Sequence, residues 1–449
     1  LGAYNSRFGQ NIQTGLFSKV LMGVYDVQNT YLNVLGIYTN TTQVDAYRGA
    51  GRPEAIYLLE RIMDRAAREL KIDPLELRRI NFIKKDNFPY QSSTGEMIDV
   101  GDFDRVLTAA EISADIKGFQ RRKKESEAKG RLRGLGLCYY IESILGDPSE
   151  EAKVVFEEDG DVKIFVGTQS NGQGHETVFA QFLSDQTGIP TEKITVVQGD
   201  SDLIPNGGGT GGSRSVTVQN NATLAAVEKV IQAFSQYLSE KLGVDVENIE
   251  FDDISFRING SNYSPNVLEV ANMACEDQRF DLLTHSAKAT LDARSFPNGA
   301  HFAEVEIDPE TGFVQVVRYS VVDDFGNLIN PMLAEGQVHG GVAQGIGQAL
   351  YEHVVFDKEG QLLTATFMDY GMPRAQDLPY YKFETECVPS TANIMGMKGC
   401  GEAGTVGALA AVANAVQDAL WEIGIQQVDM PFTSEKIWSM INSSNLAAE

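Results

Sequence analysis

The chain has 449 residues, and its 37 lysines and arginines stand against 62 aspartates and glutamates, which gives a formal net charge of −25. At about 150 residues per domain, this length predicts two to four domains. A hydrophobic content of 43% is typical of a globular protein and excludes a disordered chain. The negative charge repels phosphate backbones and anionic lipids, so we do not expect nucleic acid as a partner. No run approaches about 18 consecutive apolar residues, so no membrane span is expected.

The four cysteines lie far apart in the sequence, at Cys138, Cys275, Cys387 and Cys400. They are scattered and lack any short Cys-x-x-Cys spacing, which argues against a zinc ribbon, an iron–sulfur site and a secreted disulfide framework. A reducing compartment, the cytoplasm, is therefore expected. The chain opens at Leu1 without a methionine or a secretory leader, and we expect it to begin within a domain.

Residues 1–47 contain short β-branched and aromatic runs, such as residues 31–38, and these predict strands. A glycine-rich turn follows at residues 47–53. From Glu54 the apolar residues recur every three to four positions, and Pro53 stands where a first helical residue belongs. The sequence therefore predicts a helix directly after the turn.

Residues 120–134 are polar and locally basic, which predicts a solvated helix end with a linker, and we expect a domain boundary there. Residues 152–166 are typical of a β-hairpin closed by an Asp-Gly turn. Beyond the hairpin the patterns predict a helix at 176–185, a strand at 193–197, a glycine-rich loop at 206–214 and a long helix at 216–242.

A second hairpin is predicted within residues 301–319, where two apolar runs flank a Pro-Glu-Thr-Gly turn. Helices rich in small residues are expected at 336–350 and 405–423, and small residues let neighbouring backbones approach closely. Since strands and helices alternate irregularly, the sequence predicts an α+β chain of at least two domains.

Four glycine-rich segments are candidates for a ligand site, at residues 48–52, 171–175, 207–214 and 398–404. Three of them lead directly into a predicted helix, where free backbone N–H groups and the positive end of the helix dipole favour anions. A plain chain connection is the alternative for each segment taken alone. The sequence contains neither a P-loop nor a dinucleotide-binding Gly-x-Gly-x-x-Gly pattern between a strand and a helix.

Five segments, taken in order, resemble the molybdenum-binding subunit of the xanthine oxidase family of molybdenum hydroxylases. They are residues 45–55 (DAYRGAGRPEA), 172–177 (GQGHET), 209–215 (GTGGSRS), 335–341 (EGQVHGG) and 398–404 (KGCGEAG). The resemblance extends over nearly the whole chain, and it is strongest for the carbon-monoxide-dehydrogenase-like or aldehyde-oxidase-like large subunits.

The resemblance implies an elongated α+β subunit with several domains. Residues 1–125 would be the C-terminal part of the first molybdopterin-binding domain, with the upstream part missing. Residues 126–449 would be the second such domain, with halves of about 126–295 and 296–449.

Carried over motif by motif, the resemblance also assigns roles to single residues. Glu402 matches the family's catalytic glutamate, and Arg48 matches its arginine that orients substrate or stabilises charge. The residues expected to hold the pterin, its pyrophosphate and the ligands of molybdenum are Gln173, Gly174, Gly211, Gly212, Ser213, Arg214 and Gln337, with Arg78 as a weaker match for a further cofactor contact. The pterin dithiolene would hold the metal, so no side chain is expected as a metal ligand.

The local chemistry at two of these positions agrees with the assigned roles. Glu402 lies just before an apolar helix, whose N-terminus favours an ionised, proton-accepting carboxylate. A glutamate that only caps the helix is the alternative. Arg48 is a fixed cation suited to negative charge that develops on a substrate. A structural salt bridge is its alternative.

The resemblance further implies a cofactor and partners. The cofactor would be molybdopterin with molybdenum, which bacterial members usually carry as the cytosine dinucleotide, and an aldehyde or N-heterocycle would be hydroxylated with oxygen from water. Electrons would pass to iron–sulfur and FAD subunits. The upstream half of the molybdenum domain would come from a separate chain or have been lost, and without it we expect residues 207–214 and 399–404 to be mobile and the cofactor weakly held.

Two departures from the family qualify this interpretation. Gly49 follows Arg48 where carbon-monoxide-oxidising members have the copper-bridging cysteine, so copper is not expected. The family's upstream Gly-Gly-Gly-Phe-Gly segment is not in the sequence. The alternatives are a degenerate assembly subunit that keeps the fold without cofactor, and a glycine-loop nucleotide enzyme of another kind.

Overall fold

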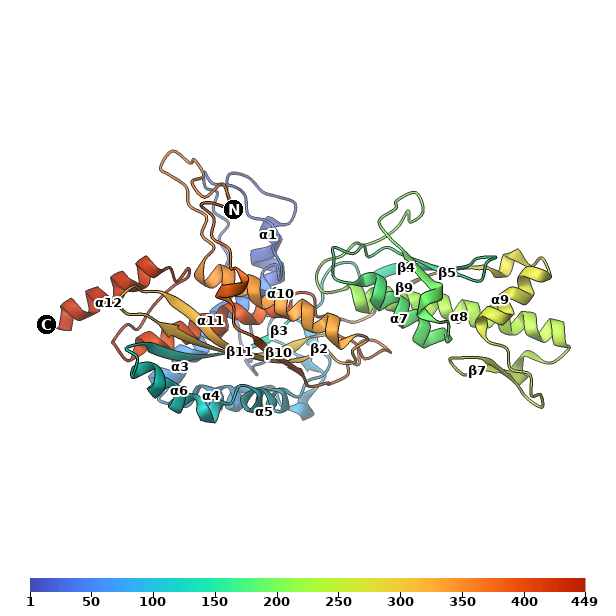
Figure 1. The fold of residues 1–449 in the computed structure, drawn as a ribbon, viewed down its shortest axis with the longest axis horizontal. Coiled ribbons are helices and arrows are strands. Elements are labelled where there is room, and N and C mark those ends of the chain that lie inside the picture. Colours follow the sequence, from blue (N-terminus) through green and yellow to red (C-terminus); the bar gives the residue numbers. More distant parts are fainter. Residues whose placement is uncertain (449) are drawn as a thin grey trace.

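The computed structural model describes the backbone of residues 1–448 and the side-chain surroundings of residues 1–444. The chain forms two bodies, each with its own sheet and hydrophobic core (Figure 1). The core of the first body takes residues from 20–141 and from 296–441, and that of the second body takes residues from 152–287. The chain therefore leaves the first body, builds the second and returns.

The first body is organised around a four-stranded sheet with the order β12-β11-β10-β3. Its strands are β3 (Leu132–Ile141), β10 (Asn298–Ile307), β11 (Val314–Asp324) and β12 (Tyr381–Thr385). β10 pairs antiparallel with both neighbours, and β12 joins β11 in parallel. The β10–β11 pair confirms the hairpin predicted within residues 301–319.

Helices cover both faces of this sheet. α11 packs on β3 and β10 and is covered by α10 and α3, whereas α5 packs on β10 and β11 and α6 packs on β3. The helices of this body are α3 (Arg52–Leu70), α4 (Pro74–Asn81), α5 (Phe103–Ser113), α6 (Phe119–Glu127), α10 (Pro331–Leu350), α11 (Ala403–Trp421) and α12 (Ser434–Ala448), and a short ribbon of β1 (Tyr90–Gln91) and β2 (Met97–Ile98) lies beside them. The helix predicted after the glycine-rich turn is confirmed as α3.

Helix α11 lies directly on strand β3, backbone against backbone. A methyl group added at Gly134 or Gly136 would stand 2.0 Å from the carbonyl oxygen of Ala415 or Ala411, respectively, so no side chain fits there. The small residues predicted for this helix thus serve close packing. Although α11 is apolar, neither it nor any other helix within residues 1–448 is both long enough and apolar enough to cross a bilayer.

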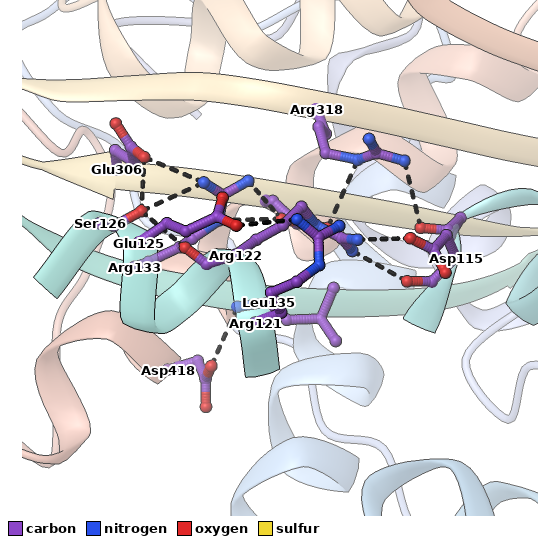
Figure 2. Close-up of polar contacts among 12 residues, drawn as sticks. Asp115, Arg121, Arg122, Glu125, Ser126, Arg133, Leu135, Glu306, Arg318 and Asp418 are labelled. Atoms are coloured by element: carbon purple, nitrogen blue, oxygen red, sulfur yellow. Dashed lines mark hydrogen bonds and ion pairs between the residues drawn. The ribbon is translucent and has the colours of Figure 1, made fainter. Parts of the chain in front are cut away.

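The prediction of a solvated helix end at the basic run 120–134 holds only in part. Arg121, Lys124 and residues 127–130, where α6 ends, are exposed, whereas Arg122 and Arg133 are buried and both donate to Glu304 on β10. Arg318 lies 3.6 Å from the same carboxylate, and Figure 2 shows the three guanidinium groups gathered beside the sheet. We call these four residues the Glu304 cluster. A buried carboxylate therefore accounts for two of the basic residues of this run, and the domain boundary expected near it stays a prediction.

The second body has a sheet with the order β6-β5-β4-β9, on which the long helix α8 packs against β4 and β9. Its elements are β4 (Ser149–Phe156), β5 (Val162–Val166), α7 (His175–Thr187), β6 (Ile194–Val197), α8 (Ser215–Leu242), β7 (Ile249–Phe251), β8 (Phe256–Ile258), α9 (Val267–Glu276) and β9 (Thr284–Thr290). The predicted hairpin at 152–166, both predicted helices and the predicted strand at 193–197 are confirmed.

The N-terminal residues 1–47 do not form the predicted strands. They contain α1 (Gly9–Asn11), a π-helical turn (Ile12–Leu16) and α2 (Phe17–Lys19), and residues 31–37 have no regular structure. Tyr31 is 89% exposed. An apolar run needs a partner to become a strand, and among the described residues this run has only the bridge between Gly2 and Tyr38.

Candidate active site

A cavity of about 640 Å³ lies where the two bodies meet. It is lined by residues 171–173, 210–213, 327–330 and 400–402, together with Arg48, Gln337 and Gln344. Four helices, α7, α8, α10 and α11, begin at its walls. Because the first N–H groups of a helix have no partner within it, such a cavity is suited to an anionic ligand. The four glycine-rich segments predicted as ligand sites thus meet at one place.

The carboxylate of Glu402 is held at the cavity wall by three donors. The backbone N–H of Gly49 donates to Oε1 at 2.9 Å, and Arg52 and Ser213 donate to Oε2 at 2.6 and 3.1 Å. Glu402 makes no capping hydrogen bond to α11, so the interpretation as a simple helix cap is wrong. The side chain is instead fixed in one orientation, with its residue 9% exposed.

Arg52 connects Glu402 to a second carboxyl group, that of Glu142. The fully buried guanidinium donates to Glu142 Oε1 at 2.7 Å, to the carbonyl oxygen of Ser143 at 2.8 Å and to that of Gly49 at 2.6 Å. The sequence interpretation missed Arg52 and Glu142. The signal was present, because Glu142 directly follows the apolar strand β3, and a charge in such a place needs a buried partner.

The two carboxyl groups have opposite pKa shifts. Burial raises the pKa of Glu142 to about 8, with the nearby charge of Glu402 adding to the effect and Arg52 opposing it. Burial acts on Glu402 in the same sense, but the charge of Arg52 and the hydrogen bond from Gly49 hold its pKa below the ordinary value. These opposite shifts favour the proton on Glu142 and the negative charge on Glu402.

Arg48 lies on the same cavity and has only neutral partners. Its Nε donates to the carbonyl oxygen of Gly401 at 2.6 Å, and its two Nη atoms donate to the side-chain oxygens of Gln344 and Gln337 at 3.0 Å. Within the described residues no carboxylate lies at ion-pair distance from it, so the interpretation as a structural salt bridge is wrong. A cation without a paired anion can stabilise negative charge on a ligand.

The glycine loop before α8 is held from behind by Arg214. This buried side chain donates to the carbonyl oxygen of Gly209 at 2.6 Å and to Glu150 at 3.2 Å, and Glu150 also accepts from the backbone of Gly208. Arg214 does not line the cavity, so it shapes the loop and makes no contact there. Gly211 does line it, and a methyl group added at this position would meet nothing within 4 Å.

The remaining predicted residues divide into two groups. Gln173, Gly212, Ser213 and Gln337 line the cavity. Gly174 does not: it precedes α7 with φ +80° and lies against Leu333. Arg78 is buried in α4, where it donates to Glu60 at 2.9 Å away from the cavity wall. The geometry gives no support to a cofactor contact by Arg78, which stays a prediction.

Cys400 is the one cysteine that lines the cavity. Burial, with Glu142 adding to the effect and Arg48 opposing it, raises the pKa of its thiol to about 12. The thiol is therefore neutral at physiological pH and has no nucleophilic character there.

Comparison with known families agrees with this geometry. Two models described as molybdopterin cofactor-binding domains match the chain, one over residues 1–82 and the other over residues 109–379, which is more than half of it. The chain belongs to this family. The motifs that predicted a molybdenum-binding subunit of the xanthine oxidase family are thereby confirmed.

Two curated relatives of this molybdopterin-binding chain are named as a large chain and a large subunit. It is 32% identical over 453 residues to the carbon monoxide dehydrogenase large chain of Hydrogenophaga pseudoflava, with 96% of this chain and 56% of that one covered. It is 34% identical over 435 residues to the nicotine 6-hydroxylase large subunit of Paenarthrobacter nicotinovorans, with 92% and 53% covered. The chain thus spans just over half the length of these relatives.

Solved structures give the same result for the fold. The quinoline 2-oxidoreductase of Pseudomonas putida 86 matches with a TM-score of 0.92 and 31% identity, over 98% of this chain and 58% of that one. The reconstituted CO dehydrogenase of Oligotropha carboxidovorans matches with a TM-score of 0.88 and 30% identity, over 96% and 56%. The predicted α+β multi-domain fold is confirmed.

Proposed function

We propose that this molybdopterin-binding chain is the catalytic part of a molybdenum hydroxylase, which hydroxylates an aldehyde or an N-heterocycle with oxygen from water. The observation that carries the proposal is the ionised carboxylate of Glu402, held by three donors on the wall of the cavity that Arg48 also lines. A fixed base beside an unpaired cation is the arrangement that proton removal with charge stabilisation requires.

The cavity has the features that the cofactor needs. Gly172 and Gly211 line the cavity, and a methyl group added at either position would meet nothing within 4 Å. A flat pterin can therefore approach the backbone closely at these two glycines. The N-termini of α7 and α8 suit the pyrophosphate, and we assign the amides of Gln173 and Gln337 to the pterin and its metal centre. When bound, the cofactor supplies the oxygen-transfer and two-electron redox chemistry. We propose the cytosine dinucleotide form.

Each protein residue then has a distinct task. Glu402 accepts a proton at its carboxylate, which Arg52 and Gly49 keep ionised. Arg48 stabilises negative charge that develops on the substrate, and Gln337 and Gln344 fix the orientation of its guanidinium. Because the arginine is already oriented, no reorganisation is needed as charge develops.

The substrate class is argued from two facts. Two similar proteins are named for the N-heterocycles nicotine and quinoline, and Gly49 offers no thiol beside Arg48, which argues against the copper of a carbon monoxide dehydrogenase. We propose that electrons pass to iron–sulfur and FAD subunits in the cytoplasm. We further propose that the upstream half of the molybdenum domain, as a separate chain or a preceding segment, completes the site.

Substitution Glu402→Gln in the complete enzyme tests the general base. We expect turnover to fall by about 10²- to 10⁴-fold, the usual contribution of general-base catalysis, with molybdenum content unchanged. Glu335→Gln is the matched control, because this glutamate lies on α10 but does not line the cavity, and it should keep full turnover. Turnover of Glu402→Gln within tenfold of wild type would contradict the role.

Metal and nucleotide analysis of the complete enzyme separates the proposal from its alternatives. Stoichiometric molybdenum with a released cytosine dinucleotide agrees with a hydroxylase. A folded assembly without molybdenum would indicate a degenerate assembly subunit. A bound mononucleotide without molybdenum would indicate a glycine-loop nucleotide enzyme.

A further inference from the structure

Two buried carboxyl groups share one guanidinium at the cavity. Arg52 contacts Glu142 at 2.7 Å and Glu402 at 2.6 Å, and the side chains of Arg52 and Glu142 are both 0% exposed. The second oxygen of Glu142, Oε2, is buried and has no hydrogen-bond partner among the described residues. A buried oxygen without a partner costs more free energy on an ionised carboxylate than on a protonated carboxyl group.

The backbone holds the two carboxyl groups at a set separation. Glu142 directly follows β3, and Glu402 directly precedes α11. Strand and helix touch without intervening side chains at Gly134 and Gly136, which lie against Ala415 and Ala411. This contact fixes the strand and the helix from whose ends the two carboxyl groups extend toward Arg52.

The groups around Glu142 cannot neutralise two negative charges. The ionisable groups that influence it are Arg52, Glu402, Arg48, Cys400 and Tyr140. Burial raises the pKa of both the Cys400 thiol and the Tyr140 phenol, so these groups are neutral. Arg48 makes its contacts elsewhere, which leaves Arg52 as the direct counter-ion of both carboxyl groups.

Hydrogen bonds decide which of the two groups keeps the proton. Glu402 accepts from Gly49, Ser213 and Arg52, and donors of this kind favour the charged form of a carboxyl group. Glu142 accepts one short hydrogen bond, from Arg52, and Ser213 and Glu402 lie near enough to influence its pKa. The arrangement is one ionised and one protonated carboxyl group on a single arginine.

We propose that Glu142 is a positioning residue for Glu402: it takes the proton of the pair, so that Arg52 directs its charge to Glu402 and keeps that carboxylate ionised at the cavity wall. This inference rests on the proposed function only where activity is measured. The protonation of Glu142 is a property of the chain itself and can be tested without turnover.

Infrared spectroscopy of the full chain, labelled with ¹³C at the glutamate carboxyl carbon, tests the protonation directly. At pH 7 we expect an isotope-sensitive carboxylic-acid C=O band that Glu142→Gln removes. Glu60→Gln is the control, because Glu60 is equally buried but has Arg78 as its own counter-ion, and it should leave the band in place. The absence of the band in the wild type, or its persistence in Glu142→Gln, would overturn the inference.

Activity of the complete enzyme gives the second readout. Since glutamine resembles a protonated carboxyl group, Glu142→Gln should keep turnover within tenfold of wild type at pH 6 to 7 and remove the ionisation near pH 8 from the kcat/KM profile. Glu142→Ala should lose more than tenfold, because nothing then holds Arg52 from that side. Equal losses of turnover in Glu142→Gln and Glu142→Ala would show that Glu142 has only a structural role. If Glu402→Gln stayed active but the infrared band behaved as expected, the proposed function would fail while this inference stood.

Discussion

The two buried charge clusters of the first body differ in how many guanidinium groups the buried carboxylate has. In the Glu304 cluster three guanidinium groups lie around one buried carboxylate, both of whose oxygens accept hydrogen bonds, and two of these arginines also pair with the more exposed Asp115 and Glu306. At the cavity one guanidinium, that of Arg52, serves two carboxyl groups. A carboxylate with several guanidinium partners stays ionised, whereas two carboxyl groups on one guanidinium leave one proton to be distributed between them. The first arrangement stabilises the fold, and the second can accept a proton.

The location of the clusters agrees with this difference. The Glu304 cluster joins α6 to the sheet (Figure 2), and none of its residues lines the cavity. The site cluster leaves Glu142 Oε2 without a partner, and unpaired buried polar atoms together with shifted pKa values are features of functional sites. Similar burial of charge therefore has two different consequences in one protein.

Removal of the shared arginine should give the largest loss of stability. Arg52→Met leaves two buried carboxyl groups without a counter-ion, and breaking a buried ion pair from one side costs about 3–5 kcal/mol. Arg122→Met should cost less, about 1–2 kcal/mol, because Glu304 keeps Arg133. Urea unfolding followed by the fluorescence of Trp421 and Trp438, the two tryptophans of the chain, measures both variants. Equal losses of unfolding free energy in Arg52→Met and Arg122→Met would show that the two clusters do not differ in this way.

The pH dependence of stability should identify Glu142. Its pKa is raised from 4.5 to about 8 in the folded chain, so between these values the folded state holds a proton that the unfolded state has lost. The free energy of unfolding must then fall as pH rises through this range. The lowered pKa of Glu402 acts in the other sense, with stability lost as pH falls below its ordinary range.

Glu142→Gln should remove the first of these slopes. Each unit of pKa difference corresponds to about 1.4 kcal/mol, so the variant should gain a few kcal/mol relative to wild type between pH 5 and pH 8. Urea unfolding at the two pH values measures the change, and Glu304→Gln serves as the control because it belongs to the other cluster. An identical pH dependence in wild type and Glu142→Gln would show that the carboxyl group is ionised throughout.

The smallest effect is expected at the edge of the Glu304 cluster. The side chain of Arg318 is 42% exposed and lies 3.6 Å from Glu304, and exposed ion pairs contribute about 0–1 kcal/mol. Arg318→Ala should therefore change the free energy of unfolding by less than about 1 kcal/mol, and added salt should reduce the difference further. A loss as large as that of Arg122→Met would mean that all three arginines contribute equally.

Local pattern was sufficient for much of the fold. The hairpins at 152–166 and 301–319 and the helices α3, α7, α8, α10 and α11 follow from periodicity and turn residues, and all are present. Residues 31–37 show where this fails: the run has strand composition, but pairing depends on a neighbour that no local pattern reveals. The prediction for the basic run 120–134 failed in part for a similar reason, because its counter-ion Glu304 lies about 170 residues farther along the chain.

Site residues could be predicted from the sequence only where they belong to a recognisable motif. Glu402, Arg48, Gln173 and Gln337 were assigned by resemblance and lie on one cavity. Arg52 and Glu142 are separated by 90 residues and meet only after β3 has entered the sheet. Arg214 was assigned to the ligand, whereas its donors are used to hold the loop. A motif identifies which residues belong to a site but not which of them face the ligand.

The direct contact between β3 and α11 has a consequence for the evolution of this protein. Gly134 and Gly136 admit no side chain, so a substitution at either position would have to shift the helix against the sheet, and with it the backbones that carry Glu142 and Glu402. This layer therefore tolerates less change in sequence than surface segments such as the exposed residues around Tyr31 and Phe367.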